Sequence, residues 1–409
     1  MLRKGDLTQG GITGTLLHFT LPMMVGSFLQ QCYNIADTLI VGQCIGAGAL
    51  AAVGSAYTLM VFLISVLLGL AMGSGTVFSL HYGAGNHVAL RRSIFSSFAL
   101  IGIVTLILNV VVFIWLDPIL RLLQVPQDIY GMMRSYLWII FCGIVFTFIY
   151  NFYASLLRAV GDSVTPLWFL AVSVVLNIAL DLFFILQLDW GIQGAAAATV
   201  LAQGVAALGI IIYTYRRRPE LRWHHEDMCF DRTCLKEIAS FSTLTCVQQS
   251  VMNLGILMIQ GLVNSFGTAV MAAFAAAVKI DSFAYMPVQE FGNAFSTFIA
   301  QNFGAGRPYP PGCSQCICHG CCFFAPCVRI GFHLCQTVDA YLCPSGRNGD
   351  YCGGSGVPTH RRCFLLWHRH LVFAVRILSG HPYAGHVCCA DRAVAGHPCS
   401  SFLLACFDT

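Results

Sequence analysis

Long apolar runs separated by short polar loops fill the chain up to about residue 307. The runs are continuously apolar rather than alternating, which favours helices over the strands of a barrel. Each is long enough to cross a bilayer at roughly 1.5 Å of rise per residue. Eight such runs are found: Leu16–Gly42, Ala47–Leu80, Ile94–Leu116, Met132–Leu156, Leu167–Leu188, Ile192–Tyr215, Ile238–Val263 and Thr268–Ile299. The pattern predicts an all-α, polytopic membrane protein.

Basic residues in the loops alternate between the two sides of the predicted membrane. One side holds Arg3, Lys4, Arg91, Arg92, Arg158, Arg216, Arg217, Arg218, Arg222, Arg232, Lys236 and Arg307. The other side holds Arg121 and Arg134, together with Asp117, Asp128 and Asp189. Loops rich in Lys and Arg stay in the cytoplasm, so the N-terminus is expected to be cytoplasmic.

Two pairs of short motifs indicate an internal repeat. Gln30-Gln31 matches Gln248-Gln249, and the HYGAG that begins at His81 matches the NFGAG that begins at Asn302. A period of about 220 residues with an even number of spans per half is typical of a parallel repeat about an axis along the membrane normal. We therefore expect a first lobe of six helices over residues 1–222. A second lobe would begin with two helices over residues 223–307.

Composition supports a membrane protein and excludes several other classes. The chain is 57% hydrophobic and 10% charged, with a mean hydropathy of +0.73, which soluble domains do not reach. A net charge of +4 is too small to indicate a nucleic-acid partner. The sequence contains no GxxxxGK[ST], HExxH or GxSxG motif, so it predicts neither an enzyme nor a nucleotide-driven pump.

Residues 308–409 differ in character from the rest of the chain. Fourteen of the 20 cysteines lie there, and the segment contains neither Lys nor Glu. We interpret this tail as out-of-frame translation after a frameshift near Gly306–Pro308. A zinc module is the alternative, because Cys313 and Cys316, like Cys318 and Cys321, are spaced as CxxC. The two pairs lack the usual loop of roughly 12–20 residues between them, so no metal site is predicted.

Candidate chemistry comes from polar residues inside the apolar runs. Asp37 interrupts the first run, and an ionisable group at membrane depth is costly unless it faces a polar cavity. Asn177 and Asp181 lie at i and i+4 of the fifth run, hence on one face, and Thr199 follows a stretch of small residues in the sixth. Two close carboxylates in a dry pocket would hold one proton and release it to an entering cation or on opening. That is the chemistry of an ion-coupled antiporter.

Interpretations in which these residues bind no ion also remain open. Asp37 would reach interfacial water if it lay near a helix end, and Asn177 and Asp181 would serve only to hold helices together. In the register of the repeated glutamines, the second lobe has Gly255 in the place of Asp37. Glu290, in the eighth run, is a candidate for contact with the substrate.

Four segments resemble the multidrug and toxic compound extrusion (MATE) transporters, and most of all their bacterial DNA-damage-inducible-type branch. They are ADTLIVGQCIGAGALAAVG, FSLHYGAGNH, LRAVGDSVTP and LNIALDLFFI. The resemblance covers residues 1 to about 307 and implies a fold of twelve helices in two lobes. It also implies ion-binding positions at Asp37, Asn177, Asp181 and Thr199, with Gln30 and Tyr33 as neighbours.

The function implied by the resemblance is secondary active efflux. Amphiphilic or cationic organic compounds would be exported by alternating access, against an inward flow of H⁺ or Na⁺ and without a cofactor. The expected setting is a monomer among the lipids of a bacterial cytoplasmic membrane. A lipid-linked sugar flippase of the same fold is an alternative, and so is a non-functional, truncated transporter remnant, because the tail departs from the family pattern.

Overall fold

The computed structural model describes residues 7–9, 11–122, 125, 127–223, 225–228, 232–264, 286–287 and 289–307. Every regular element among them is a helix. The predicted all-α membrane fold is confirmed for this part of the chain. The elements are α1 (Ile12–Cys44), α2 (Ala47–Gly83), α3 (His87–Leu122), α4 (Gln127–Cys142), α5 (Ile144–Ala159), α6 (Val164–Leu182), η1 (Phe183–Gln187), α7 (Gly191–Arg217), η2 (Pro219–Leu221), η3 (His225–Asp227) and α8 (Arg232–Asn264). Residues 289–304 form a further helix.

Contacts divide the chain into Met1–Cys343 and Pro344–Thr409, and all described residues belong to the first unit. The tail 308–409 and residues 265–285 of the predicted second lobe lie outside the described residues. The division between lobes at residue 222 therefore stays a prediction.

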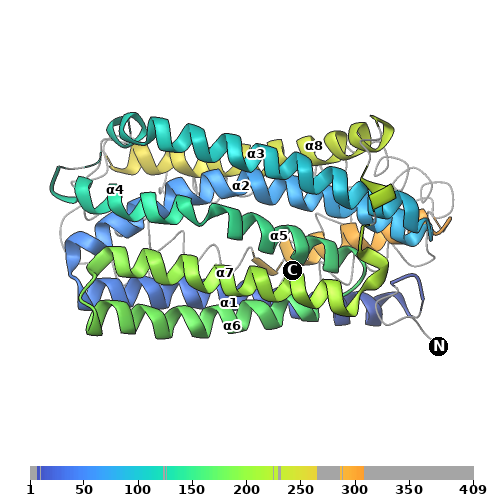
Figure 1. Ribbon diagram of the computed structural model, residues 1–409, viewed down its shortest axis with the longest axis horizontal. Coiled ribbons are helices and arrows are strands. Elements are labelled where there is room, and N and C mark those ends of the chain that lie inside the picture. The colour runs from blue at the N-terminus through green and yellow to red at the C-terminus, as the bar shows by residue number, and fades with distance from the viewer. Residues whose placement is uncertain are drawn as a thin grey trace, which may run out of the picture. The chain divides into compact units, whose positions relative to one another are not determined.

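The helices of the first unit form two packed groups joined by a third (Figure 1). In one group α1 and α7 both pack against α6, and in the other α3 and α8 both pack against α2. The consecutive helices α4 and α5 contact both α2 and α7, and so lie between the groups. Phe152 of α5 is fully buried, with the rings of Phe78 and Phe98 at 5.9 and 5.2 Å.

Four described helical segments are long and apolar enough to span a membrane, and a fifth span results if α4 and α5 count as one bent helix. The four that qualify as single helices are Gly48–Gly83, His87–Arg121, Val164–Gln187 and Gly191–Arg217. The first predicted run forms the 33-residue helix α1, which is not among these segments.

The fourth predicted run, Met132–Leu156, is not one straight helix. It divides at Gly143 into α4 and α5, which meet at a bend of 48°. A Cβ on Gly143 would lie 2.5 Å from Cγ2 of Val200 on α7. Glycine therefore permits the close approach of α7 at the bend, a tertiary requirement that hydrophobicity alone does not reveal.

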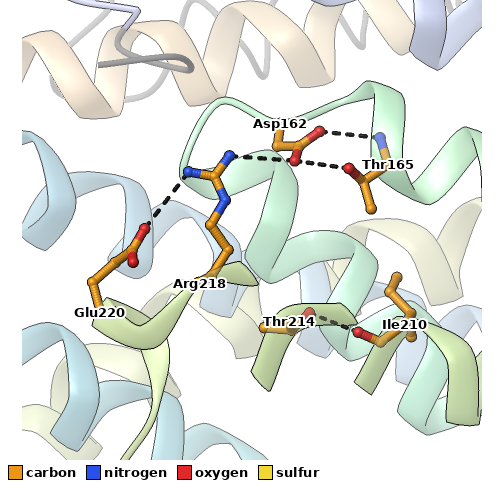
Figure 2. Close-up of polar contacts among 6 residues, drawn as sticks. All are labelled: Asp162, Thr165, Ile210, Thr214, Arg218 and Glu220. Carbon is orange, nitrogen blue, oxygen red and sulfur yellow. Dashed lines mark hydrogen bonds and ion pairs between the residues drawn. The ribbon is translucent and has the colours of Figure 1, made fainter. Parts of the chain in front are cut away.

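A short loop of residues 160–163 joins α5 to α6. Gly161 has a φ of 82°, and Pro166 lies in the first turn of α6, where a missing N–H costs nothing. Asp162 accepts hydrogen bonds from the backbone N–H and the hydroxyl of Thr165, at 3.0 and 2.8 Å. Figure 2 shows that Arg218, beyond the end of α7, reaches the same carboxylate.

Arg218 joins this loop to the segment that follows α7. Its guanidinium lies 3.3 Å from Asp162 and 3.6 Å from Glu220. Burial lowers the pKa of Arg218, but the two carboxylates outweigh that effect and leave its pKa above the ordinary value. The α5–α6 loop and the C-terminal end of α7 are thereby held together at one end of the bundle.

Candidate functional site

Asp37 of α1 and Asp181 of α6 face each other inside the first group of helices. Their side chains are only 7% and 0% exposed, and their carboxyl groups are close enough to interact directly. Two negative charges at this separation repel strongly, and one proton shared between them removes the repulsion. The expectation that Asp37 reaches interfacial water is therefore not supported, because the residue is buried.

Each carboxyl group keeps an oxygen for which the described residues provide no partner. These atoms are Oδ1 of Asp37 and Oδ1 of Asp181. A buried carboxylate oxygen without a donor costs free energy that a bound proton or cation recovers. Each of these oxygens can therefore accept a proton or contact a cation.

Asn177 and Thr199 extend the pair into a cluster of four. The amide of Asn177 is satisfied when its nitrogen donates to Oδ2 of Asp181 at 2.9 Å and its oxygen accepts from the backbone N–H of Thr199 at 3.2 Å. Asn177 is 1% exposed and Thr199 is 6% exposed. Asn177 is thus more than a connector between helices, because it supports one of the two carboxylates.

Tyr33 connects α1 to the cluster through Thr199. The threonine hydroxyl donates to the carbonyl oxygen of Ala195 at 3.1 Å, so in its contact with Tyr33, at 3.2 Å, it is the tyrosine hydroxyl that donates. Of the expected neighbours, Tyr33 therefore joins the cluster directly. Gln30 lies one turn earlier on α1 and is half-buried, but the described contacts do not bring its side chain to the carboxylates.

Small residues allow α7 to approach α6 closely enough for these contacts. A Cβ on Gly194 would lie 3.0 Å from Cβ of Phe184, and Ala195, Ala196 and Ala198 are all fully buried. Phe184 belongs to η1, a π-helix that begins two residues after Asp181. Such helices recur at functional sites, where they change the direction of the residues around them.

Tyr136 of α4 belongs to the same neighbourhood and was not predicted. It is 4% exposed and lies within electrostatic reach of Asp37, Tyr33 and Asp181. A tyrosine inside an apolar run is a weak signal, since a buried hydroxyl usually has a polar neighbour. The distance in sequence between the fourth run and the first concealed the connection.

Glu290 lies apart from the cluster. The hydroxyl of Ser27 on α1 donates to its Oε1 at 2.7 Å, and its Oε2 is buried without a partner among the described residues. Ser27 precedes Asp37 by about 15 Å along the helix at 1.5 Å per residue. Glu290 therefore contacts the helix that carries Asp37 but does not share its site.

The ligand types in the cluster are all hard oxygen donors. Carboxylate, amide and hydroxyl oxygens suit protons and hard cations rather than soft metals. Within the described residues, no three His, Cys, Asp or Glu side chains come together as a metal site. The arrangement can therefore hold a proton or a hard monovalent cation between two helices.

Comparison with known proteins identifies the family of this fold. The MatE family model matches residues 22–183 and 245–333, which together are more than half of the chain. The chain belongs to the MATE family. Its members are transporters rather than enzymes, and the matched region includes Asp37, Asn177 and Asp181.

Two curated relatives of this MATE chain are bacterial. A probable multidrug resistance protein, YpnP of Bacillus subtilis (strain 168), is 32% identical over 313 residues, which are 75% of this chain and 68% of YpnP. A multidrug export protein, MepA of Staphylococcus saprophyticus, is 26% identical over 296 residues, 70% of this chain and 64% of MepA. The chain thus spans about two-thirds of the length of each.

A solved structure supports the same fold. The crystal structure of a MATE protein in complex with MaD3S has a TM-score of 0.75 at 22% identity, over 84% of this chain and 78% of that one. At this identity the similarity establishes the fold alone. The helices described above therefore have the arrangement of a MATE transporter.

Proposed function

We propose that this MATE chain is a secondary active efflux transporter that exports amphiphilic or cationic organic compounds in exchange for H⁺ or Na⁺. One observation carries the proposal: the buried Asp37–Asp181 pair, with an unpartnered oxygen on each carboxyl group. An antiporter needs a site that binds its coupling ion and gives it up when the conformation changes. This pair supplies such a site, and Asn177 and Thr199 support it.

Movement of α1 would couple this site to the substrate. Pro22 lies inside α1 and removes one backbone hydrogen bond, which permits bending. The nearby Gly26 is buried against Leu167, with a Cβ there at ordinary contact distance of 3.6 Å, so a bend would change the packing of α1 on α6. Ion binding changes the charge of Asp37, and the balance between straight and bent α1 would shift with it. The substrate would then leave on the outer side.

Efflux from vesicles tests the proposal. The full chain would be reconstituted in liposomes loaded with ethidium, an amphiphilic organic cation, and efflux would be followed by fluorescence under an imposed ion gradient. Asp37→Asn is expected to reduce efflux to the rate of empty vesicles, because the pair can no longer exchange a proton. Asp128→Asn, on the exposed first turn of α4, is the matched control. Unchanged efflux in Asp37→Asn would overturn the antiporter proposal.

The same vesicles distinguish the coupling ions. A proton gradient without Na⁺ and a Na⁺ gradient at constant pH would be applied in turn. Efflux driven only by the first assigns H⁺, and efflux driven only by the second assigns Na⁺. Efflux with neither gradient would argue against coupling by this site.

The expected setting is the cytoplasmic membrane of a bacterium, with the N-terminus inside. The contacts support this orientation, since basic residues of the predicted cytoplasmic loops occur at one end of the bundle with the N-terminal segment. Arg307 donates to the carbonyl oxygen of Thr8 at 2.9 Å, and Arg91 contacts Asp227 at 2.7 Å. We propose that the protein acts there as a monomer among lipids, with small organic molecules and no nucleic acid as partners.

The predicted lobes 1–222 and 223–307, the DNA-damage-inducible-type branch and the frameshift near Gly306–Pro308 also remain proposals. The family match continues past that point, to residue 333. DNA sequencing across the codons for residues 304–333 tests the frame. A single-base correction that restores apolar spans would support a full-length transporter, whereas an intact frame would support the tail as written.

A further inference from the structure

The two GAG motifs end their helices with the same turn. Gly85 and Gly306 have φ values of 68° and 72°. The N–H of Asn86 donates to the carbonyl of His81 at 3.1 Å, and the N–H of Arg307 donates to that of Asn302 at 2.8 Å. The sequence repeat is therefore also a repeat of backbone conformation.

These two helix ends cross each other in direct backbone contact. A Cβ on Gly83 would fall on the carbonyl oxygen of Gln301, and a Cβ on Gly304 would fall on the carbonyl oxygen of Leu80. Leu80 and Gln301 occupy the same position relative to their motifs, and so do Gly83 and Gly304. The contact is therefore symmetric: each repeat contributes the same two positions to it. We name this contact of Leu80 and Gly83 with Gln301 and Gly304 the glycine crossing.

The side chain of Gln301 fastens the crossing on one side only. It is fully buried, and its amide nitrogen donates to the carbonyl of Ala159 at the end of α5, at 2.6 Å. Its amide oxygen accepts from the backbone N–H of Leu7, at 3.2 Å. The first repeat has an apolar leucine, Leu80, at this position. Its side chain cannot make the two hydrogen bonds that Gln301 makes.

Helix 289–304, which carries Gln301, also packs against the N-terminal half of α1. Leu16, Phe19 and Met23 form a buried cluster with Ala294 and Phe298, and Ser27 binds Glu290. Pro22 lies within this half of α1, and Asp37 lies beyond it. A bend in α1 would therefore move helix 289–304 relative to the site at Asp37.

We propose that the glycine crossing is a gate between the two repeats at this end, with the side chain of Gln301 as its latch. This inference rests on the proposed transport function, under which this end is cytoplasmic. The gate opens when α1 bends, because α1 and helix 289–304 move together. Close backbone contact at Gly83 and Gly304 suits such a gate, since neither glycine has a side chain that interlocks with the opposite helix.

Hydrogen–deuterium exchange of the purified full chain tests the crossing. Gly83→Ala and Gly304→Ala each place a methyl group on the opposite carbonyl. Gly54→Ala, on an exposed position of α2 with open space around it, is the matched control. Either gate variant is expected to raise exchange about ten-fold in both 80–86 and 301–307, while residues 177–199 stay protected. Faster exchange only beside the substitution, or throughout the chain, would overturn the proposal.

The latch has its own matched substitution. Gln301→Leu installs the residue that the first repeat has at this position, with similar size and no hydrogen bonds. Exchange at residues 7–9 and 301–307 is expected to rise, while the glycine backbones still fit. Exchange equal to that of the unaltered chain would show that Gln301 is not a latch.

If the crossing is a gate, its opening must depend on the state of the proposed ion site at Asp37. If it is only a fixed structural contact, which we call a brace, its opening does not depend on that site. Exchange at the crossing, corrected for intrinsic rates, would be compared at alkaline and mildly acidic pH. The comparison uses a His81→Gln background, which removes the contact of His81 with Glu237 at 3.5 Å beside the crossing. We expect a change in this background that is lost when Asp37→Asn is added, whereas a pH-independent crossing would identify a brace and overturn the proposal. Exchange does not depend on net transport, so failure of ethidium efflux would count against the proposed function and leave the gate to be decided by these data.

Discussion

The helices α1 and α8 begin the two predicted repeats, but they differ in the residues that they carry. In the register of Gln30 and Gln248, Asp37 corresponds to Gly255, and a Cβ at Gly255 would meet nothing within 4 Å. α8 instead packs its backbone on α2, where a Cβ on Gly69 would lie 2.5 Å from Cα of Cys246. Helix α1 thus carries a buried carboxylate, and α8 makes a close helix contact.

This asymmetry teaches that a duplicated fold need not duplicate its site. The carboxylate of Asp37 is useful because Asp181, Asn177 and Thr199 stand opposite it, on α6 and α7. A carboxylate on α8 would need an equally elaborate partner set.

The strongest test of the asymmetry moves the carboxylate from one repeat to the other. The double variant Asp37→Asn with Gly255→Asp should show ethidium efflux no higher than empty vesicles, because the transferred carboxylate cannot pair with Asp181. Efflux from reconstituted vesicles measures this, with Gly255→Asp alone as the control for folding. Recovery of efflux in the double variant would show that the two repeats are interchangeable.

A smaller effect is expected from overpacking the contact between α2 and α8. Gly73 approaches the backbone of Ser242, and the hydroxyls of Ser74 and Ser242 are 3.1 Å apart. Gly73→Leu should destabilise the protein by about 1–3 kcal/mol, since the helices must separate to admit the side chain. Thermal unfolding in detergent measures the loss. Gly54→Leu, on the exposed side of α2, should unfold nearly as the unaltered chain does, and an equal loss there would contradict the packing argument.

The hydroxyl of Thr199 provides a finer test of the ion site. Thr199→Val keeps the shape of the residue but removes the acceptor for Tyr33, at a cost of about 1 kcal/mol. Thr199→Ser keeps the hydroxyl and should retain most of the stability and of the efflux. Thermal unfolding and efflux would be measured for both variants. Identical results for Thr199→Val and Thr199→Ser would show that the hydroxyl contributes neither to stability nor to efflux.

The smallest effect is expected at the charged end of the bundle. Asp162→Ala removes the acceptor at the start of α6 and the partner of Arg218, and should cost about 0.5–1 kcal/mol. Asp162→Asn keeps the acceptor and should recover part of that loss in the same unfolding assay. Arg134→Gln, which removes an exposed ion pair with Asp117, should cause no measurable change. A larger loss there would indicate that surface pairs stabilise this protein.

Much of the first lobe could be predicted from the sequence, for a physical reason. Lipid requires long apolar helices, so hydrophobic runs reveal the elements, and the cost of burying Asp37, Asn177 and Asp181 indicates a candidate site. The i, i+4 spacing of Asn177 and Asp181 is a local pattern, and it is sufficient to predict that these two side chains share one face of α6.

Other features depend on tertiary contacts that no local pattern encodes. The bend at Gly143 follows from the approach of Val200, which lies far along the chain. Tyr136 reaches the site only because α4 packs beside α7. Glu290 was expected near the substrate cavity together with Tyr33, but a predicted helix does not specify which turn of α1 it contacts.

The glycine crossing also has a consequence for the origin of the chain. A contact between equivalent positions of two repeats is isologous, as in a symmetric dimer. A single motif therefore provides both of its sides. A protein of half this length, assembled as two identical copies, would make the same contact, and duplication and fusion of its gene would preserve it. Gln301 and Asp37 would then be substitutions that the fusion made possible, because each half could change without changing the other.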